Sequence, residues 1–261
     1  MDRKFTLSDK NSMNPIVLIP SRLASTRLPN KPLLDLHGLP MIVQVMKRAE
    51  SAMVGPVVVA CADKEIKLAV EKAGGNAVLT DPDHPSGSDR IFEALKIIDP
   101  QSAFNFIINI QGDLPTLEPD LPQKSLNLLK NSAVDIGTLA SPIFNDKELE
   151  DPNIVKVLVS EEKGGISGKA IDFTRSDKYD NHILKWHHIG LYTYRPETLE
   201  KFVSLPQSQS EISSKLEQLR ALDAGMRIDV AFVDTVPLGV DTPADLEKAR
   251  EELQIYGKRI N

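Results

Sequence analysis

The sequence predicts an α/β protein built around a parallel, doubly wound sheet. Between residues 16 and 110, short apolar and β-branched runs alternate with segments that repeat apolar residues at helical spacing. The connections between these segments are short. A parallel sheet produces this pattern because its strands are buried on both faces and each crossover to the next strand needs a helix.

The first half of the chain follows this alternation. Residues 16–19 form a first strand, since the run is too short and too β-branched for a helix. Apolar spacing then predicts a helix at 40–52. Asp63 is expected to cap a later helix, which Gly74 and Gly75 end. The other elements predicted in this half are strands at 56–61, 76–80 and 104–110 and a helix at 91–98.

The middle of the chain has strand signals without full helices between them. Strands are expected at 136–143, 154–159 and 188–194, with a turn at 161–165 and a polar loop at 176–185. Consecutive strands of this kind favour antiparallel pairing. We therefore expect a mixed or antiparallel insertion at about residues 152–195, used as an arm for association.

The last third returns to α/β order. A helix is predicted at 211–224 with Gly225 as its stop, followed by a strand at 228–233. The final helix opens at Thr242, because Pro243 and an acidic residue in the first turn are typical of a helix start.

These elements predict a single domain over residues 15–257. Residues 1–14 are polar and mixed in charge, and they lack the apolar core of a signal peptide. We expect them to form a flexible N-terminal extension.

Composition places the chain among ordinary globular proteins. Of its 261 residues, 41% are hydrophobic and 26% are charged, and the net charge is -6. An acidic chain offers no overall attraction for nucleic acid or an anionic membrane, so any polyanion must meet a local cationic cluster. The single cysteine, Cys61, cannot form an internal disulfide and fits a reducing compartment. No apolar run approaches the ~18 residues of a membrane span, so we expect a cytoplasmic protein that binds neither nucleic acid nor membrane.

A basic loop follows the first strand. It carries Arg22, Arg27 and Lys31, and Pro29 and Pro32 stiffen its exit. Cations on a loop at the carboxyl end of a buried strand are placed to receive a polyanion. Solvated surface charges are the alternative explanation, but three cations on one rigid loop favour binding. The loop matches neither the phosphate-binding pattern G-x-x-x-x-G-K-[ST] nor the dinucleotide pattern G-x-G-x-x-G.

Two aspartates are candidates for holding a divalent cation. Asp113 follows the strand at 104–110 in a tight turn, and Asp241 immediately precedes Thr242. A turn aspartate is the commoner explanation for Asp113 alone, and the helix dipole accounts for Asp241. Both positions fall on the carboxyl edge of the predicted sheet. Two carboxylates there could supply the oxygen ligands that Mg²⁺ prefers beside phosphate and water.

Other polar residues have structural explanations when they are taken alone. His187 and His188 lack the spacing of metal ligands. Tyr192 is as readily a packing residue as a ligand contact. Glu217 and Gln218 fall on an amphipathic helix, whose polar face is normally solvated.

Several motifs together resemble one known family. The basic loop at 19–33 reads IPSRLASTRLPNKPL and is similar to that of the 3-deoxy-manno-octulosonate cytidylyltransferases (CMP-Kdo synthetases). The match continues in the family's order with DHPSGSDR at 83–90, NIQGDLP at 109–115, PNIVKV at 152–157, HIGLY at 188–192, LEQLR at 216–220 and GVDTP at 239–243. The resemblance covers nearly everything from Pro15 to Arg250.

The resemblance implies a Rossmann-like α/β nucleotidyltransferase. Its central sheet would be mostly parallel with helices on both faces, and its mixed or antiparallel arm would form a homodimer. The implied reaction transfers a cytidylyl group from CTP to the anomeric hydroxyl of 3-deoxy-manno-octulosonate (Kdo), an eight-carbon 2-keto acid sugar. Pyrophosphate would be released, and the product would enter lipopolysaccharide biosynthesis.

The resemblance also implies roles for the residues that match its motifs. The triphosphate would be held by Arg22, Ser25, Arg27 and Lys31, with Arg90 and Gln111 as further nucleotide contacts. Mg²⁺ would be ligated by Asp113 and Asp241. The catalytic set would be Arg22, Arg27, Lys31, Asp113 and Asp241. The sugar site would be lined by Arg175, His188, Tyr192, Glu217 and Gln218.

The chain departs from the family pattern at several positions. Leu114 and Ser214 stand where the family commonly has glutamate. Ala62 precedes Asp63 where the family usually reads Ala-Thr-Asp. None of these departures removes a candidate metal ligand or a loop cation.

Two alternatives stay open. The acceptor could be a related 2-keto acid sugar, such as amino-Kdo or a sialic acid. The chain could also be a non-catalytic homologue that binds CTP, although the intact set Lys31, Asp113 and Asp241 counts against this.

Overall fold

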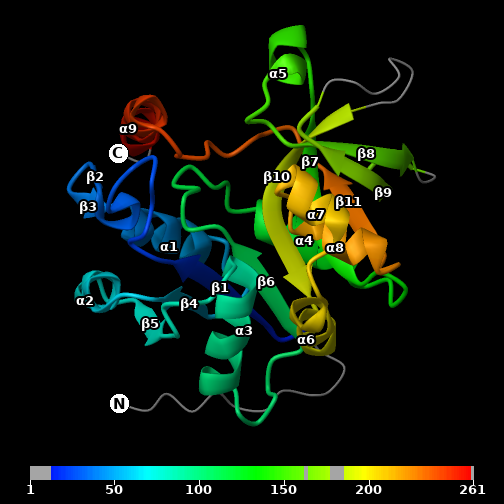
Figure 1. The fold of residues 1–261 in the computed structure, drawn as a ribbon. Helices are drawn as coiled ribbons and strands as arrows, with labels where there is room; N and C mark the ends of the chain where they lie inside the picture. The colour runs from blue at the N-terminus through cyan, green and yellow to red at the C-terminus, as the bar shows by residue number, and fades with distance from the viewer. Residues whose placement is uncertain (1–12, 162–163, 177–184, 260–261) are drawn as a thin grey trace. The chain divides into compact units, whose positions relative to one another are not determined.

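The computed structural model of the protein describes residues 13–161, 164–176 and 185–259 (Figure 1). The chain divides into two compact units, of which unit 1 comprises Met1–Asp120 and Pro237–Asn261 and unit 2 comprises Leu121–Val236. The predicted extension at 1–14 falls outside the described residues up to residue 12. The single domain predicted over 15–257 stays a prediction, because compactness does not show whether either unit folds alone.

Unit 1 contains the parallel sheet that the sequence predicts. Its strands are β1 (Pro15–Ser21), β4 (Val57–Cys61), β5 (Asn76–Leu79) and β6 (Phe106–Ile110). They lie in the order β5-β4-β1-β6, and the pairings between them are parallel. In the central strand β1, Ile16 to Ile19 are fully buried, as expected for a strand that is covered on both faces.

Helices cover both faces of this sheet. Neighbouring side chains of β1 point in opposite directions and meet different helices. Ile19 and Ile42 of α1 (Met41–Ser51) both approach Gly112, whereas Pro20 packs against Gly87 of α3 (Gly87–Ile98). The remaining elements of unit 1 are η1 (Lys31–Leu33), the short hairpin β2 (Asp35–Leu36) and β3 (Leu39–Pro40), α2 (Lys64–Lys72) and α9 (Pro243–Arg259).

Two predicted helix starts differ in detail from the structure. α3 begins at Gly87 rather than at residue 91, because Ser86 Oγ accepts the Asp89 N–H and caps the helix earlier. Asp63 occupies the N-cap position of α2, but its carboxylate makes no cap bond. It accepts the Leu23 N–H of the basic loop instead, at 2.7 Å. The residue predicted to cap a helix therefore anchors the basic loop.

The start of α9 is as predicted. Thr242 Oγ1 accepts the Asp245 N–H at 3.2 Å, and the Asp245 carboxylate accepts the Thr242 N–H at 2.9 Å. This reciprocal pair satisfies two amide groups that a helix terminus leaves open.

Within the described ranges, no helix has the length and apolar character needed to cross a membrane.

Unit 2 contains five strands in the order β10-β7-β11-β9-β8, and β8 also pairs with β10. The order of the strands therefore closes on itself through a short pairing of β8 with β10, from Lys185 to His187. Pairing of β7 with β11 is parallel, and the other pairings are antiparallel. Their bounds are β7 (Ile136–Pro142), β8 (Lys156–Glu161), β9 (Ser167–Thr174), β10 (Lys185–Tyr194) and β11 (Ile228–Phe232).

The sequence predicted the antiparallel character of the middle region but missed β9. The parallel pairing expected for the whole sheet predominates only in unit 1. β10 pairs with β7 from Trp186 to Tyr194, so this part of the segment predicted as an arm is built into the sheet of unit 2. Residues 162–163 and 177–184, which fall in the predicted turn and polar loop, lie outside the described residues.

The helices of unit 2 include one correction. The helix predicted at 211–224 is two short helices, because Lys215 adopts a left-handed conformation (φ 54°) that ends the first of them. Arg220 nevertheless joins both pieces, since its guanidinium donates to the Glu211 carboxylate at 2.9 and 3.0 Å. The unit contains α4 (Leu121–Leu128), α5 (Asp146–Glu150), α6 (Pro196–Ser204), α7 (Gln209–Ser214) and α8 (Gln218–Asp223).

Candidate functional site

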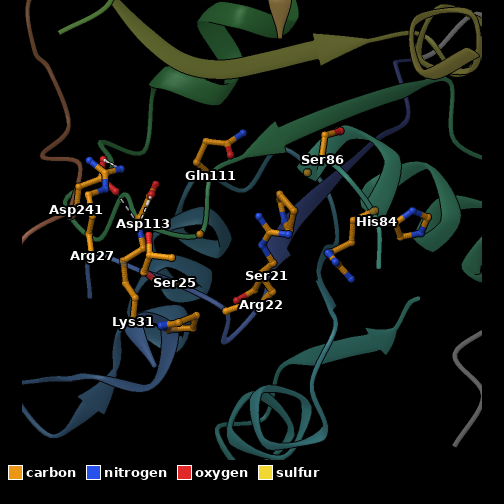
Figure 2. Close-up of a pocket in the computed structure, with 17 residues that line it drawn as sticks. Ser21, Arg22, Ser25, Arg27, Lys31, His84, Ser86, Gln111, Asp113 and Asp241 are labelled. Carbon is orange, nitrogen blue, oxygen red and sulfur yellow. Dashed lines mark hydrogen bonds and ion pairs between the residues drawn. The ribbon is translucent and has the colours of Figure 1, made fainter. Parts of the chain in front are cut away.

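The candidate nucleotide and metal residues line one cavity of about 400 Å³ in unit 1 (Figure 2). Its walls come from the loop after β1, the start of α3, the turn after β6 and the segment before α9. β1 and β6 are parallel neighbours, so the loops that leave their carboxyl ends lie on the same edge of the sheet. The sequence placed Asp113 and Asp241 on this edge, and in the structure both line the cavity.

Lys31 is the centre of the charged end of the cavity. Its Nζ donates to Asp113 Oδ2 at 2.8 Å, to the carbonyl oxygen of Val240 at 2.9 Å and to Asp241 Oδ1 at 3.1 Å. Burial alone would lower the pKa of Lys31, but the carboxylates of Asp113 and Asp241 outweigh it and raise the pKa. The ammonium therefore stays charged at neutral pH and holds two carboxylates that are far apart in the sequence.

The arginines of the basic loop complete the positive side of the cavity. Arg27 pairs with Asp241 at 3.0 Å, although both side chains are largely exposed. Arg22 is exposed and lines the same cavity. Four cationic side chains, those of Arg22, Arg27, Lys31 and Arg90, line it together with two carboxylates. A chain of net charge -6 thus has an excess of positive charge at this place, which suits a polyanionic ligand.

Backbone contacts hold the loop and the C-terminal segment in place. The bond from Leu23 N–H to Asp63 fixes the start of the basic loop, and the Val240 N–H donates to the Asp113 carbonyl at 3.0 Å. Ser25 lines the cavity, and its Oγ accepts weakly from the Leu28 N–H at 3.4 Å. Sequence reasoning missed the role of Asp63. Its position at the carboxyl end of β4, next to the strand that carries the basic loop, was the available signal.

The two other nucleotide candidates also line the cavity, and Arg90 has a structural role there. Its guanidinium is buried and donates to Thr80 Oγ1 at 2.7 Å and to the Asp81 carbonyl at 2.8 Å. Burial lowers the pKa of Arg90, and the charge of Arg22 lowers it further. Gln111 lines the cavity and donates from Nε2 to Asn109 Oδ1 at 3.3 Å. Their proposed contacts with nucleotide stay predictions.

The charged end of the cavity fits a divalent cation. Asp113 and Asp241 converge on one ammonium group, so two hard oxygen donors already face a common positive charge. The described residues contain no group of three or more His, Cys, Asp or Glu side chains that could hold a metal. A pair of carboxylates matches Mg²⁺, which keeps several waters and takes further oxygens from substrate phosphates.

The five candidate sugar residues all belong to unit 2, where they are only partly gathered. His188 and Tyr192 lie on β10 with ring centroids 5.6 Å apart. Burial raises the pKa of Tyr192 above its usual value, and the charge of Glu217 adds to this. Gln218 is buried at the start of α8. The Arg175 guanidinium donates to the carbonyls of Pro152 and Asn153, so it clamps a turn rather than joining the others.

Comparison with known proteins defines the class of protein that carries this site. The sequence pattern of the cytidylyltransferase family matches residues 16–228. A protein from Paramagnetospirillum magneticum is 53% identical over 242 residues, which are 93% of this chain and 98% of that protein. One from Parvibaculum lavamentivorans is 56% identical over 240 residues, which are 92% of this chain and 93% of that protein. The chain therefore belongs to the cytidylyltransferase family.

Both relatives are named 3-deoxy-manno-octulosonate cytidylyltransferase. A solved structure of CMP:2-keto-3-deoxy-manno-octonic acid synthetase complexed with CTP has a TM-score of 0.83 and 36% identity, and the match covers 93% of this chain and 99% of that one. The recognition drawn from the motifs is thereby confirmed. A 4-diphosphocytidyl-2C-methyl-D-erythritol synthase from Anaerococcus prevotii shares the fold, with a TM-score of 0.61 and 14% identity.

Proposed function

We infer that this protein transfers a cytidylyl group from CTP to the anomeric hydroxyl of Kdo, with release of pyrophosphate. Relatives and a CTP-bound neighbour that match nearly the whole chain carry this activity in their names. The observation that carries the proposal in this chain is the meeting of Lys31, Asp113 and Asp241 beside a basic loop at one sheet edge. A triphosphate and a divalent cation are the ligands that such a site fits.

We propose that the basic loop holds the triphosphate. Arg22 and Arg27 are exposed, Arg27 pairs with Asp241, and Lys31 is fixed between the two carboxylates. Cations placed around the β- and γ-phosphates neutralise the charge that develops on the pyrophosphate leaving group. Ser25 adds a hydroxyl to the same wall.

Asp113 and Asp241 are proposed to hold Mg²⁺. When bound there, the ion would supply charge neutralisation at the α-phosphate and would lower the pKa of the attacking hydroxyl. The chain's own contribution to the reaction is alignment. In-line displacement needs little covalent help from the protein, and much of the rate gain comes from holding the two reacting oxygens and the phosphorus in line.

His188, Tyr192, Glu217, Gln218 and Arg175 are the proposed acceptor residues. We further propose a homodimer that forms through the segment at about 152–195, in a cytoplasmic enzyme. Light scattering after size exclusion measures the dimer directly, and a monomer at micromolar concentration contradicts it.

Pyrophosphate release tests the reaction. Purified protein with CTP, Mg²⁺ and Kdo should release pyrophosphate, and the same mixture without Kdo should not. Amino-Kdo and a sialic acid in place of Kdo identify the preferred acceptor. No release with any 2-keto acid sugar, while CTP still binds, would leave the non-catalytic alternative standing. Chelation of Mg²⁺ should abolish release, and undiminished release in a chelator contradicts the metal proposal.

Lys31→Met tests the charged centre of the site. Its loss should raise the KM for CTP at least tenfold, because the positive charge that Lys31 places beside the triphosphate disappears. Asp113 and Asp241 then lose the ammonium that they share, and only Arg27 still pairs with Asp241, so added Mg²⁺ should raise the melting temperature of this variant more than that of wild type. Lys72→Met, an exposed lysine of α2, is the matched control. An unchanged CTP dependence in Lys31→Met contradicts the assignment.

A further inference from the structure

A β-bulge in β10 lies opposite Thr138 of β7. Ile189 pairs with Leu139 and Thr193 pairs with Gly137, so residues 190–192 of β10 face Thr138 alone. A bulge of this kind interrupts the ladder and redirects the side chains of the bulged strand. Here it separates His188 from Tyr192, the two candidate sugar residues of β10.

The side chain of Thr138 contacts backbone carbonyl groups of the bulge. Thr138 is fully buried. Its Oγ1 lies 2.8 Å from the Leu191 carbonyl oxygen, 3.2 Å from the Ile189 carbonyl oxygen and 3.0 Å from His188 Nε2. One hydroxyl thus contacts two backbone acceptors of the bulge and one ring nitrogen.

The number of protons that these groups can donate indicates which tautomer of the His188 imidazole is present. A threonine hydroxyl has one proton to donate, and a carbonyl oxygen can only accept. The proton therefore goes to a bulge carbonyl, of which Leu191 is the nearer. The contact with His188 must then use a proton on Nε2, which the hydroxyl oxygen accepts. Burial lowers the pKa of His188 to about 3, so the ring is neutral at neutral pH and Nδ1 carries no proton.

Nδ1 is the nitrogen of His188 that makes no hydrogen bond within the described residues. Among the described residues, the buried polar side-chain atoms without a partner are Ser21 Oγ and Trp186 Nε1. No hydrogen bond to Nδ1 is present in this part of the chain, and yet Nδ1 is not one of those buried atoms. His188 as a whole is 7% exposed, with Phe173 and Tyr192 packed beside its ring.

We propose that Thr138 is a positioning residue of the acceptor site, which fixes His188 with its proton on Nε2 so that Nδ1 accepts a hydrogen bond from a sugar hydroxyl. The proposal rests on the proposed function and deepens it. An unprotonated ring nitrogen can only accept a hydrogen bond, so it favours a hydroxyl donor and disfavours the carboxylate of a 2-keto acid sugar. His188 is therefore assigned to a hydroxyl, and the sugar carboxylate must be held by other groups.

The tautomer is measured without any assay of activity. Long-range ¹H–¹⁵N correlation spectra of protein labelled in its five histidines distinguish a protonated ring nitrogen from a bare one. His188→Gln identifies the signals of His188 by their loss. We expect a protonated Nε2 and a bare Nδ1 in wild type, and a shift of the Nδ1 signal when Kdo is added. A proton on Nδ1, or an Nδ1 signal that Kdo leaves unchanged, overturns the proposal.

Kinetics of matched variants give the second test. Thr138→Val removes the hydroxyl at nearly constant shape and should raise the KM for Kdo about tenfold, with the KM for CTP unchanged. Thr138→Ser keeps the hydroxyl and should restore the wild-type value. Thr193→Val removes another buried hydroxyl of unit 2, which bonds Ser125 and not His188, and should leave the KM for Kdo unchanged.

The outcomes separate this proposal from the proposed function. Wild type that releases no pyrophosphate with Kdo fails the proposed function, whatever the tautomer. If wild type is active and Thr138→Val keeps a normal KM for Kdo, the role of Thr138 is contradicted while the proposed function stands. Should Thr138→Val not fold, the wild-type spectra still decide it.

Discussion

The two units use ion pairs in opposite ways. In unit 1, Arg27 and Asp241 pair while their side chains remain 59% and 45% exposed. In unit 2, Arg220 and Glu211 pair with each side chain only 7% exposed. An exposed pair contributes at most about 1 kcal/mol to stability and exchanges its partner easily, whereas a buried pair cannot lose one partner without a large cost. The Arg27–Asp241 pair therefore stays available to a ligand, whereas the Arg220–Glu211 pair holds α7 and α8 together.

The largest expected effect is on the stability of unit 2. Glu211→Gln leaves the buried Arg220 guanidinium with only its longer contact to the Glu217 carboxylate, at 3.4 Å, and should lower the free energy of unfolding by about 3 kcal/mol. Arg27→Gln is the matched control in unit 1 and should change it by less than about 1 kcal/mol. Urea unfolding followed by circular dichroism measures both. Equal losses in the two variants would break the contrast between the units.

The next effect is on turnover. Asp113→Asn and Asp241→Asn each remove a charged oxygen from the candidate metal site and should lower kcat at least ~100-fold. Their melting temperatures should stay close to wild type, because the pairs they break are partly exposed. Glu65→Gln, an exposed residue of α2, should leave kcat unchanged. Near-normal turnover in either aspartate variant removes that residue from the metal site.

The pH dependence of stability tests the neutral, buried character of His188. Its pKa in the folded protein is about 3, below the 6.5 of an ordinary histidine. Between these values the unfolded chain binds more protons, so stability falls as pH falls, by at most about 1.4 kcal/mol per pH unit. The stability advantage of wild type over His188→Gln should therefore shrink as pH is lowered from 6.5 to 4. Urea unfolding across this range checks it, and a constant difference contradicts a depressed pKa.

The smallest effect concerns the anchor of the basic loop. Asp63→Ala removes the acceptor of the Leu23 N–H and should cost about 1 kcal/mol of stability. It should also raise the KM for CTP a fewfold, since the loop that carries the cations loses the hydrogen bond that anchors its start. Asp63→Asn keeps an acceptor oxygen and should behave nearly as wild type. A loss of stability without any change in the KM for CTP would limit Asp63 to a role in folding.

The site in unit 1 could be predicted from sequence because it follows from strand order. Parallel strands bring their carboxyl ends to one edge, so the loops that carry Lys31 and Asp113 were expected on the same edge once β1 and β6 were recognised. The contact of Asp63 with the basic loop was not predicted, because the rule for helix caps already explained an aspartate at that position. The break between α7 and α8 was not predicted either, since Lys215 rather than glycine takes the left-handed conformation.

Unit 2 was harder to predict because its polar residues depend on register. The sequence shows that Thr138 and His188 lie on strands, but a bulge leaves no mark in the pattern of apolar residues. Only the pairing of β10 with β7 reveals that Thr138 faces three residues and reaches His188. Arg175 likewise matches a family motif, while its contacts with Pro152 and Asn153 appear only in the structure.

The charged centre of unit 1 can form only late in synthesis of the chain, because its residues are far apart in the sequence. Asp113 belongs to the early part of the chain, whereas Asp241 is reached only after all of unit 2 has been synthesised. A nascent chain that stops within unit 2 has Lys31 and a single carboxylate, and it lacks the Val240 amide that bonds the Asp113 carbonyl. A partly translated chain therefore has no complete pair of carboxylates, and the ribosome must release the last segment before the site can close.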